Sequence, residues 1–156
     1  MAIARILVDG FSLLHAWPEL ARGKARHSAA ARDELIHQLR SYGDAISTAI
    51  TVVFDGAGPA PSHGIETAST RMFEILYSKS GQTADDIIER VTAKLVKYGE
   101  VLVVSNDFAE RDFVASVGGS VCSCDYFIRS IHSALGEFQN ELKRRNQSEL
   151  KRYRKG

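Results

Sequence analysis

Five aspartates stand where apolar stretches of the chain end or where a helix is expected to begin. They are Asp9, Asp55, Asp85, Asp86 and Asp107. Carboxylates gathered at one place repel one another, and a bound cation offsets that cost. Mg²⁺ and Mn²⁺ suit such oxygen ligands, and one or two of these ions can activate a water and stabilise the charge that develops on a phosphodiester. If the fold brings these aspartates together, they predict a divalent-metal site.

Short apolar runs rich in β-branched residues precede most of these aspartates. The runs cover residues 6–8, 50–54, 74–77, 101–104 and 120–122. Continuous runs bounded by turn residues are typical of strands buried on both faces of a parallel sheet. Ligands bind outside the carboxyl ends of the strands in such sheets. We therefore expect the aspartates to converge on one edge of the sheet.

Helical patterns separate the apolar runs. The expected N-caps of these helices are Ser28, Thr83, Asp107 and Asp125, and Gly43 is placed to end the first. Residues 10–27 and 56–70 are predicted to be irregular. Strands alternating with helices imply right-handed crossovers and a three-layer α/β/α sandwich with a mostly parallel central sheet.

Each aspartate also has an ordinary structural interpretation. Asp107 followed by Glu110 resembles a capping box, and Asp86 lies three residues after Thr83. The Asp-Gly pairs after the first two runs are turn signals. Caps and turns explain single aspartates, but they explain less readily why four of them should converge on one edge.

The composition is that of an ordinary globular domain. The chain has 156 residues, 44% apolar and 25% charged, which excludes a disordered chain, a collagen-like repeat and a disulfide scaffold. Cys122 and Cys124 do not provide the paired ligands of a zinc site. No apolar run approaches the ~18 residues of a membrane span, and the N-terminus lacks the pattern of a signal peptide. We therefore expect a cytoplasmic protein with no membrane partner.

The formal net charge of +1 conceals an uneven distribution. Residues 143–156 carry +6, which leaves −5 on residues 1–142. A basic segment binds phosphates without sequence specificity, although cations also suit the C-terminal dipole of a solvated helix. We divide the chain into a domain of residues 1–142 and a basic C-terminal tail or helix extension of residues 143–156.

Five short motifs occur in a specific order and spacing. They are Ile6-Leu-Val-Asp-Gly-Phe-Ser12, Ala16-Trp-Pro-Glu-Leu20, Val52-Val-Phe-Asp55, Tyr77-Ser-Lys-Ser-Gly-Gln-Thr-Ala-Asp-Asp86 and Val103-Val-Ser-Asn-Asp107. Together they resemble the YacP-like NYN domains, which belong to the PIN-like nucleases. The resemblance covers roughly residues 3–135, and it implies a PIN-like sandwich and metal-dependent cleavage of RNA.

The resemblance also implies roles for individual acids. The expected catalytic residues are Asp9, Asp55, Asp85 and Asp107. Asp9, Asp85 and Asp107 are expected to bind Mg²⁺ or Mn²⁺, with Asp86 in the same patch, while Asp55 binds metal or orients the water. The family usually has Asn at the position of Ser12, which keeps a hydroxyl but loses the amide's combined donor and acceptor.

Several further side chains are expected to contact RNA. They are Ser12, Trp17, Lys24, Lys79, Arg144, Arg145 and Arg152. Trp17 suits stacking on an unpaired base, although a Trp beside Pro18 equally suits packing. Lys79 precedes the acidic helix and matches the family. His15 is either a contact to phosphate or base, or a simple surface residue.

We therefore expect an endoribonuclease that cleaves single-stranded RNA, with messenger RNA as the substrate and the ribosome as a candidate setting. The alternative is an RNA- or ribosome-binding NYN-like module with weak or no catalysis, because of Ser12. A phosphatase of the haloacid dehalogenase type needs a second Asp where this chain has Phe11. Nucleotide-binding folds need a glycine-rich phosphate loop, and the sequence contains none.

Overall fold

The computed structural model describes residues 3–56, 70–79 and 81–155. The strands are β1 (Ile3–Asp9), β2 (Ala49–Phe54), β3 (Phe73–Tyr77), β4 (Glu100–Val104) and β5 (Ser120–Cys122). The helices are α1 (Gly10–Ala16), α2 (Ala29–Ile46), α3 (Ala84–Leu95), α4 (Phe108–Ser116) and α5 (Cys124–Lys155), with the short 3₁₀ helix η1 (Pro18–Ala21) after α1.

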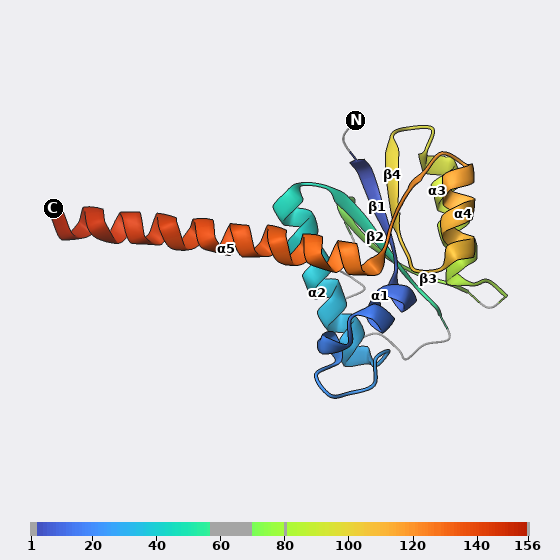
Figure 1. Ribbon diagram of the computed structural model, residues 1–156, viewed down its shortest axis with the longest axis horizontal. Helices are drawn as coiled ribbons and strands as arrows, with labels where there is room; N and C mark the ends of the chain where they lie inside the picture. The colour runs from blue at the N-terminus through green and yellow to red at the C-terminus, as the bar shows by residue number, and fades with distance from the viewer. Residues whose placement is uncertain (1–2, 57–69, 80, 156) are drawn as a thin grey trace.

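The described strands form one parallel sheet in the order β3-β2-β1-β4-β5 (Figure 1). β1 lies at the centre, where Val8 pairs with Val52 of β2 and Val104 of β4. All six residues of β2 are buried, as a strand covered on both faces requires. The predicted α/β sandwich with a parallel sheet is confirmed.

Alternate residues of β1 divide the core between the two faces of the sheet. Ile6 and Val8 pack in one cluster with α1, α2 and the first part of α5. Leu7 packs in the other cluster with α3 and with Val114 of α4. Because successive side chains of a strand point to opposite faces, this division produces the three layers. The core clusters therefore place α1, α2 and α5 on one face, and α3 and α4 on the other.

The prediction that residues 10–27 are irregular is wrong, because they contain α1 and η1. Leu13 and Leu14 are buried in the core, and Pro18 occupies the first turn of η1. A helix of seven residues is too short to show a periodic apolar pattern. The other predicted irregular segment, residues 56–70, lies largely outside the described residues.

Helix α2 begins after Ser28, as predicted, but it passes Gly43 and ends at Ile46. Ser47 follows with φ of 53°, the left-handed conformation that closes many helices. The caps predicted for α3 and α4, Thr83 and Asp107, are confirmed.

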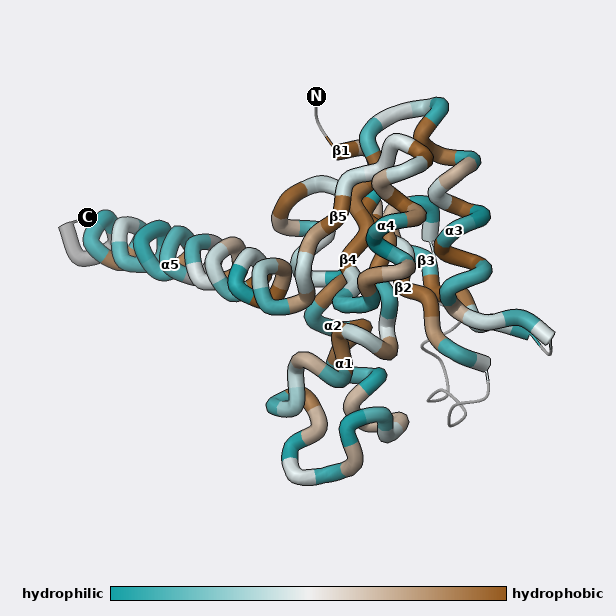
Figure 2. Tube along the Cα trace, turned by 45° about the vertical axis from the view of Figure 1, so that its right-hand side comes forward, coloured by the Kyte–Doolittle hydropathy of each residue, from teal (hydrophilic) through white to brown (hydrophobic). Residues whose placement is uncertain are grey.

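Helix α5 has two parts with different surroundings. Phe127 and Ile131 in its first part are buried in the core cluster, where α5 packs against α2 and α1. The second part projects away from the sheet, and Figure 2 shows mainly hydrophilic residues along it. Leu150 on this part is 59% exposed. The basic residues from 143 onward thus continue the helix as a projecting arm, residues 143–155.

No helix in the described parts of the chain combines the length and the apolar character needed to cross a bilayer.

Candidate metal centre

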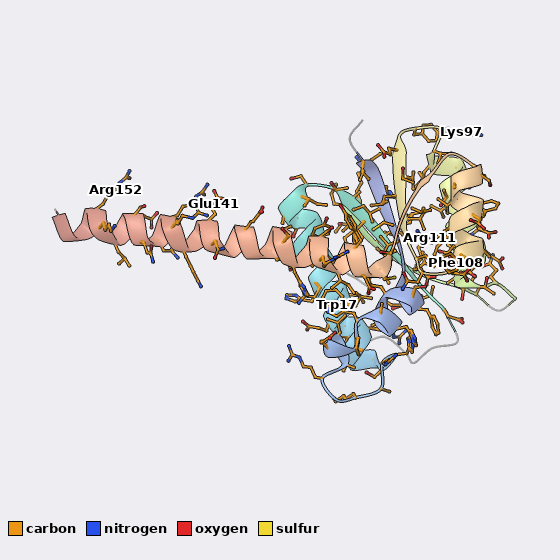
Figure 3. The ribbon with its side chains drawn as sticks, viewed as in Figure 1. Trp17, Lys97, Phe108, Arg111, Glu141 and Arg152 are labelled. Carbon is orange, nitrogen blue, oxygen red and sulfur yellow. The ribbon has the colours of Figure 1, made fainter. Side chains whose placement is uncertain are left out.

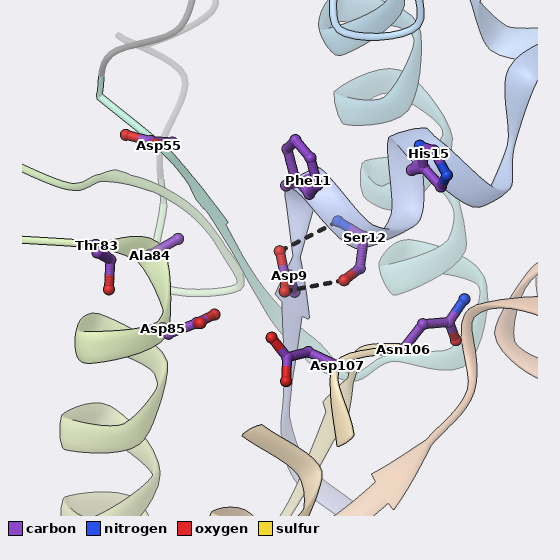
Figure 4. A pocket seen from close by; sticks show the side chains of 10 residues that line it. All are labelled: Asp9, Phe11, Ser12, His15, Asp55, Thr83, Ala84, Asp85, Asn106 and Asp107. Carbon is purple, nitrogen blue, oxygen red and sulfur yellow. Dashed lines mark hydrogen bonds between the residues drawn. The ribbon is translucent and has the colours of Figure 1, made fainter. Parts of the chain in front are cut away.

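The carboxyl ends of the central strands open into a cavity of about 480 Å³ (Figure 4). It is lined by Asp9, Phe11, Ser12, His15, Asp55, Thr83, Ala84, Asp85, Asn106 and Asp107. Asp9 ends β1, Asp55 follows β2, Asp107 follows β4 and Asp85 stands in the first turn of α3. The parallel sheet therefore brings the four predicted catalytic aspartates to one cavity.

Asp9 is the most firmly held of these acids, with only 4% of its surface exposed. Its carboxylate accepts hydrogen bonds from the Ser12 amide at 3.2 Å and the Ser12 hydroxyl at 3.1 Å. The buried Ser105 hydroxyl donates a third at 3.4 Å. Burial raises the pKa of Asp9, the charge of Asp85 adds to this effect, and the bonds from Ser12 oppose it.

A third carboxylate joins Asp9 and Asp85 from below the cavity floor. One side-chain oxygen each of Asp9, Asp85 and Glu110 lies within 4.8 Å of the others. Glu110 is 1% exposed, and among the described residues no N–H or hydroxyl group donates to its carboxyl oxygens, so the groups that meet it are the acids Asp85 and Asp9. Burial, followed by the two neighbouring acids, raises the pKa of Glu110 to about 10. We refer to Asp9, Asp85 and Glu110 as the acidic triad.

The acidic triad fits a divalent cation. Its donors are all carboxylate oxygens, the ligands that Mg²⁺ and Mn²⁺ prefer. Carboxylates buried beside one another are costly, and a cation bound between them removes the repulsion. In the metal-free protein a proton on Glu110 offsets the repulsion, and a divalent cation can take its place, because three buried or half-buried acids here face one another.

The sequence predicted only a capping role for Glu110. Asp107 does cap α4, accepting from the amides of Ala109 at 2.9 Å and Glu110 at 3.2 Å. The side chain of Glu110, however, lies in the acidic triad. The available signal was its position one turn before Val114, on the helix face that packs against the sheet.

Two of the predicted catalytic acids, Asp55 and Asp107, line the cavity outside the acidic triad, and both are exposed. Asp55 accepts a hydrogen bond from the Ser78 hydroxyl at 3.2 Å. In Figure 4, Asp107 lies close to Asp9 and Asp85, whereas Asp55 lies farther away. The structure thus offers three buried or half-buried acids for an ion and two exposed acids facing the same space.

The structure does not support the metal role predicted for Asp86. Its carboxylate accepts from the Thr83 amide at 3.0 Å, and its own amide donates to the Thr83 hydroxyl at 3.1 Å. This reciprocal capping box fixes the start of α3. Asp86 is exposed and is not part of the cavity lining, so its side chain serves the helix.

The expectation that Trp17 stacks on a base is also corrected. Trp17 is only 4% exposed and belongs to the core cluster beneath the sheet. Its ring meets that of His132 edge to face, with 5.5 Å between centroids. Burial leaves no free indole face for a nucleobase, so Trp17 anchors η1 against α5.

The remaining predicted RNA contacts lie on separate surfaces. Ser12 is half-buried and uses its amide and hydroxyl on Asp9. Lys24 and Lys79 are exposed, in the loop after η1 and just after β3. Three others, Arg144, Arg145 and Arg152, are exposed on the projecting arm. In Figure 3 the labelled Arg152 lies far from the sheet.

Comparison with known proteins identifies the family. The model of the YacP-like NYN domain matches residues 6–155. The chain belongs to the YacP-like NYN domain family. It is 29% identical over 133 residues to YacP of Bacillus subtilis strain 168, described as an uncharacterized protein, covering 82% of this chain and 75% of that one.

Crystal structures share the fold of this YacP-like chain. Rae1 (YacP) from Bacillus subtilis matches with a TM-score of 0.77 at 22% identity, over 96% of this chain and 84% of that one. A tryptophan-to-leucine mutant of the same protein matches with a TM-score of 0.76 at 22% identity, over 93% and 85% of the two chains. NYN domains are PIN-like nucleases that generally use divalent metals. The acidic triad of this YacP-like chain can bind such a metal.

We predict that Glu110→Gln stabilises the metal-free protein at neutral pH, by about 1–3 kcal/mol, because the buried carboxyl group must take up a proton on folding whereas the amide is neutral in both states. The pKa of Glu110 is about 10 in the folded state, against an ordinary value of 4.5 in the unfolded chain. The folded wild type therefore keeps a proton that the unfolded chain releases above pH 4.5. Relative to the variant, the wild type should lose stability as the pH rises from 4.5 toward 10.

Thermal melts in EDTA at pH 5.5 and pH 8 measure this difference, with the exposed Glu137→Gln on α5 as the control. Added Mn²⁺ should raise the melting temperature of the wild type and of the control more than that of Glu110→Gln. Two results would contradict the assignment of Glu110 to a metal site. One is a Glu110→Gln protein that melts below wild type in EDTA, and the other is an equal rise in melting temperature with Mn²⁺ for variant and wild type.

Proposed function

We propose that this protein is a Mg²⁺- or Mn²⁺-dependent endoribonuclease that hydrolyses phosphodiester bonds of single-stranded RNA. The buried carboxyl group of Glu110, which meets the acids Asp9 and Asp85 and no N–H or hydroxyl donor among the described residues, carries the proposal. Such an arrangement is costly for folding alone, and it lies at the edge of the sheet where ligands of parallel folds bind. Membership of a family of PIN-like nucleases supports the same conclusion.

In this proposal Asp9, Asp85 and Glu110 hold the ion. A bound divalent ion would supply positive charge for the phosphodiester oxygens and lower the pKa of water. Ser12 and Ser105 keep the Asp9 carboxylate in one orientation through their hydrogen bonds. The exposed Asp107 and Asp55 face the same cavity, where either can orient the attacking water and take its proton.

The substrate and setting extend the proposal. Messenger RNA is the proposed substrate and the ribosome the proposed setting, on the strength of the family resemblance. Lys24 and Lys79, both exposed, are proposed to meet phosphates, as are the arginines of the arm. We propose a cytoplasmic location because RNA of this kind is found there.

One observation favours the alternative of an RNA-binding module with weak catalysis. The Ser12 amide and hydroxyl both donate to Asp9, so Ser12 orients an acid and offers less to a phosphate than the usual Asn of the family. Both functions require RNA binding, but only the enzyme requires the carboxylate of Asp9. Cleavage assays separate the two.

We predict that purified wild-type protein cleaves single-stranded RNA with Mn²⁺ or Mg²⁺ and that EDTA abolishes cleavage. Asp9→Asn should lower the rate by at least about 100-fold, because it removes a charged ligand from the acidic triad while keeping its shape. Asp86→Asn is the matched control, since the capping box accounts for that acid. Gel analysis of an end-labelled RNA measures the rates.

Equal cleavage by wild type and Asp9→Asn would indicate a contaminating nuclease and contradict the enzyme. RNA binding without cleavage in any of these metals would favour the binding module.

We also predict that the projecting arm contributes salt-dependent affinity. Changing Arg144, Arg145 and Arg152 together to Gln should weaken RNA binding at low salt. The slope of log affinity against log salt should become shallower by up to about 2, since each phosphate contact contributes ~0.7 for a single strand. The control changes Arg90, Lys94 and Lys97 to Gln, three exposed basic residues outside the cavity lining.

Fluorescence anisotropy at several salt concentrations measures these slopes, and kcat should be unchanged because the arm lies far from the cavity. An arm variant with the slope of the control would show that the arm is a solvated helix end.

A further inference from the structure

Three nearly parallel rings lie together beside the acidic cavity, and two of them are stacked face on face. The rings of Phe11 and His27 are 4.4 Å apart between centroids, with 6° between their planes. The His15 ring lies 6.4 Å from each of them, at 7° to Phe11 and 12° to His27. We refer to Phe11, His15 and His27 as the ring platform.

The ring platform adjoins the acidic triad directly. Phe11 and His15 line the same cavity as Asp9 and Asp85 (Figure 4). They stand four residues apart on α1, so both project from one face of that helix, while Leu13 and Leu14 face the core. Phe11 is 58% exposed, and an aromatic face is thus presented to the space above the acids.

Basic residues continue outward from the ring platform. Arg26 lies with its Nη1 atom 3.4 Å from Nδ1 of His15 and 3.5 Å from the His15 carbonyl oxygen, to which it donates. Arg22 and Lys24 are exposed in the same loop. Acids, stacked rings and cations thus follow one another across the surface.

The order of acids, rings and basic residues matches the groups of one nucleotide and its neighbour, which are a phosphate, a base and the following phosphate. Unpaired bases stack on aromatic side chains, whatever the base, and cations near the stack hold the backbone. The lowered pKa of His27, caused by burial and then by the charges of His15 and Arg26, favours its neutral ring. A neutral His27 ring stacked on one face of Phe11 holds that ring in place, so a base would stack on the other face.

We propose that the ring platform stacks one unpaired nucleobase of an RNA strand whose phosphate lies at the acidic triad, with Arg22, Lys24 and Arg26 holding the following phosphates. The inference rests on the proposed function and specifies its substrate class. A base inside a duplex has no free face to offer, so the ring platform gives the enzyme its preference for single strands.

The test compares Phe11→Ala, Phe11→Trp and, as the matched control, Tyr98→Ala. Tyr98 is 84% exposed and precedes β4, at the opposite end of the sheet from the cavity. The probe is a set of single-stranded RNA oligonucleotides, each with 2-aminopurine at one position, bound in Ca²⁺. Stacking on the ring platform should change the fluorescence at one or two adjacent positions.

We predict that Phe11→Ala loses this position-specific change and weakens binding about 5- to 150-fold, the range of one lost base stack. Phe11→Trp should keep both signals, and Tyr98→Ala should match wild type. In Mn²⁺, Phe11→Ala should raise KM for a single strand with a smaller effect on kcat. Melting temperatures exclude unfolding as the cause, and Phe11→Trp keeps the test valid if Phe11→Ala is unstable.

The outcomes separate this inference from the proposed function. Cleavage that persists while Phe11→Ala binds like Tyr98→Ala would overturn the ring platform alone. Base-specific fluorescence changes in a protein that never cleaves would support the ring platform and overturn only the nuclease. A wild type that neither binds nor cleaves RNA would overturn both.

Discussion

The repulsion among three crowded carboxylates is the constraint on which the candidate site depends. Asp9, Asp85 and Glu110 come from β1, α3 and α4, and their oxygens lie within 4.8 Å of one another. Parallel strands bring such positions together because their carboxyl ends share one edge. Serine hydroxyls hold Asp9, but Glu110 has no donor in the described part of the chain. A cation is the simplest compensation, and the nuclease proposal follows from it.

The charge of the molecule is divided in space as well as in sequence. The acids gather in one cavity, whereas basic residues occupy the loop after η1 and the arm of α5. An RNA strand bound to the acidic triad through a metal can therefore contact basic side chains nearby, and its other phosphates do not have to lie against the carboxylates. The ring platform lies between the acidic triad and the basic loop, and it supplies the base contact that Trp17, buried in the core, does not.

The sequence predicted the features that depend on continuous apolar runs. The strands, the caps Thr83 and Asp107, and the convergence of Asp9, Asp55, Asp85 and Asp107 follow from runs bounded by turn residues. Helix α1 escaped prediction because seven residues show almost no period. The sequence does not decide between a tail and a helix extension for the arm, because its polar residues bury nothing that would fix its structure.

The side-chain partners within the site were harder to predict. Glu110 fits a capping box equally well in sequence, and only the packing of α4 on the sheet turns it toward Asp9. Asp86 shows the reverse, since its neighbour Asp85 faces the cavity while Asp86 caps α3. The ring platform joins residues on α1 and in the following loop, and no short spacing in the sequence reveals that contact.

Crystals grown with Mn²⁺ test the central claim most directly, because anomalous scattering locates the ion independently of any activity. We predict a Mn²⁺ peak within ligand distance of carboxylate oxygens of Asp9, Asp85 and Glu110, with Asp86 still in its capping box. A saturated crystal with no peak at the acidic triad, or with an ion held elsewhere without Glu110, would contradict the account.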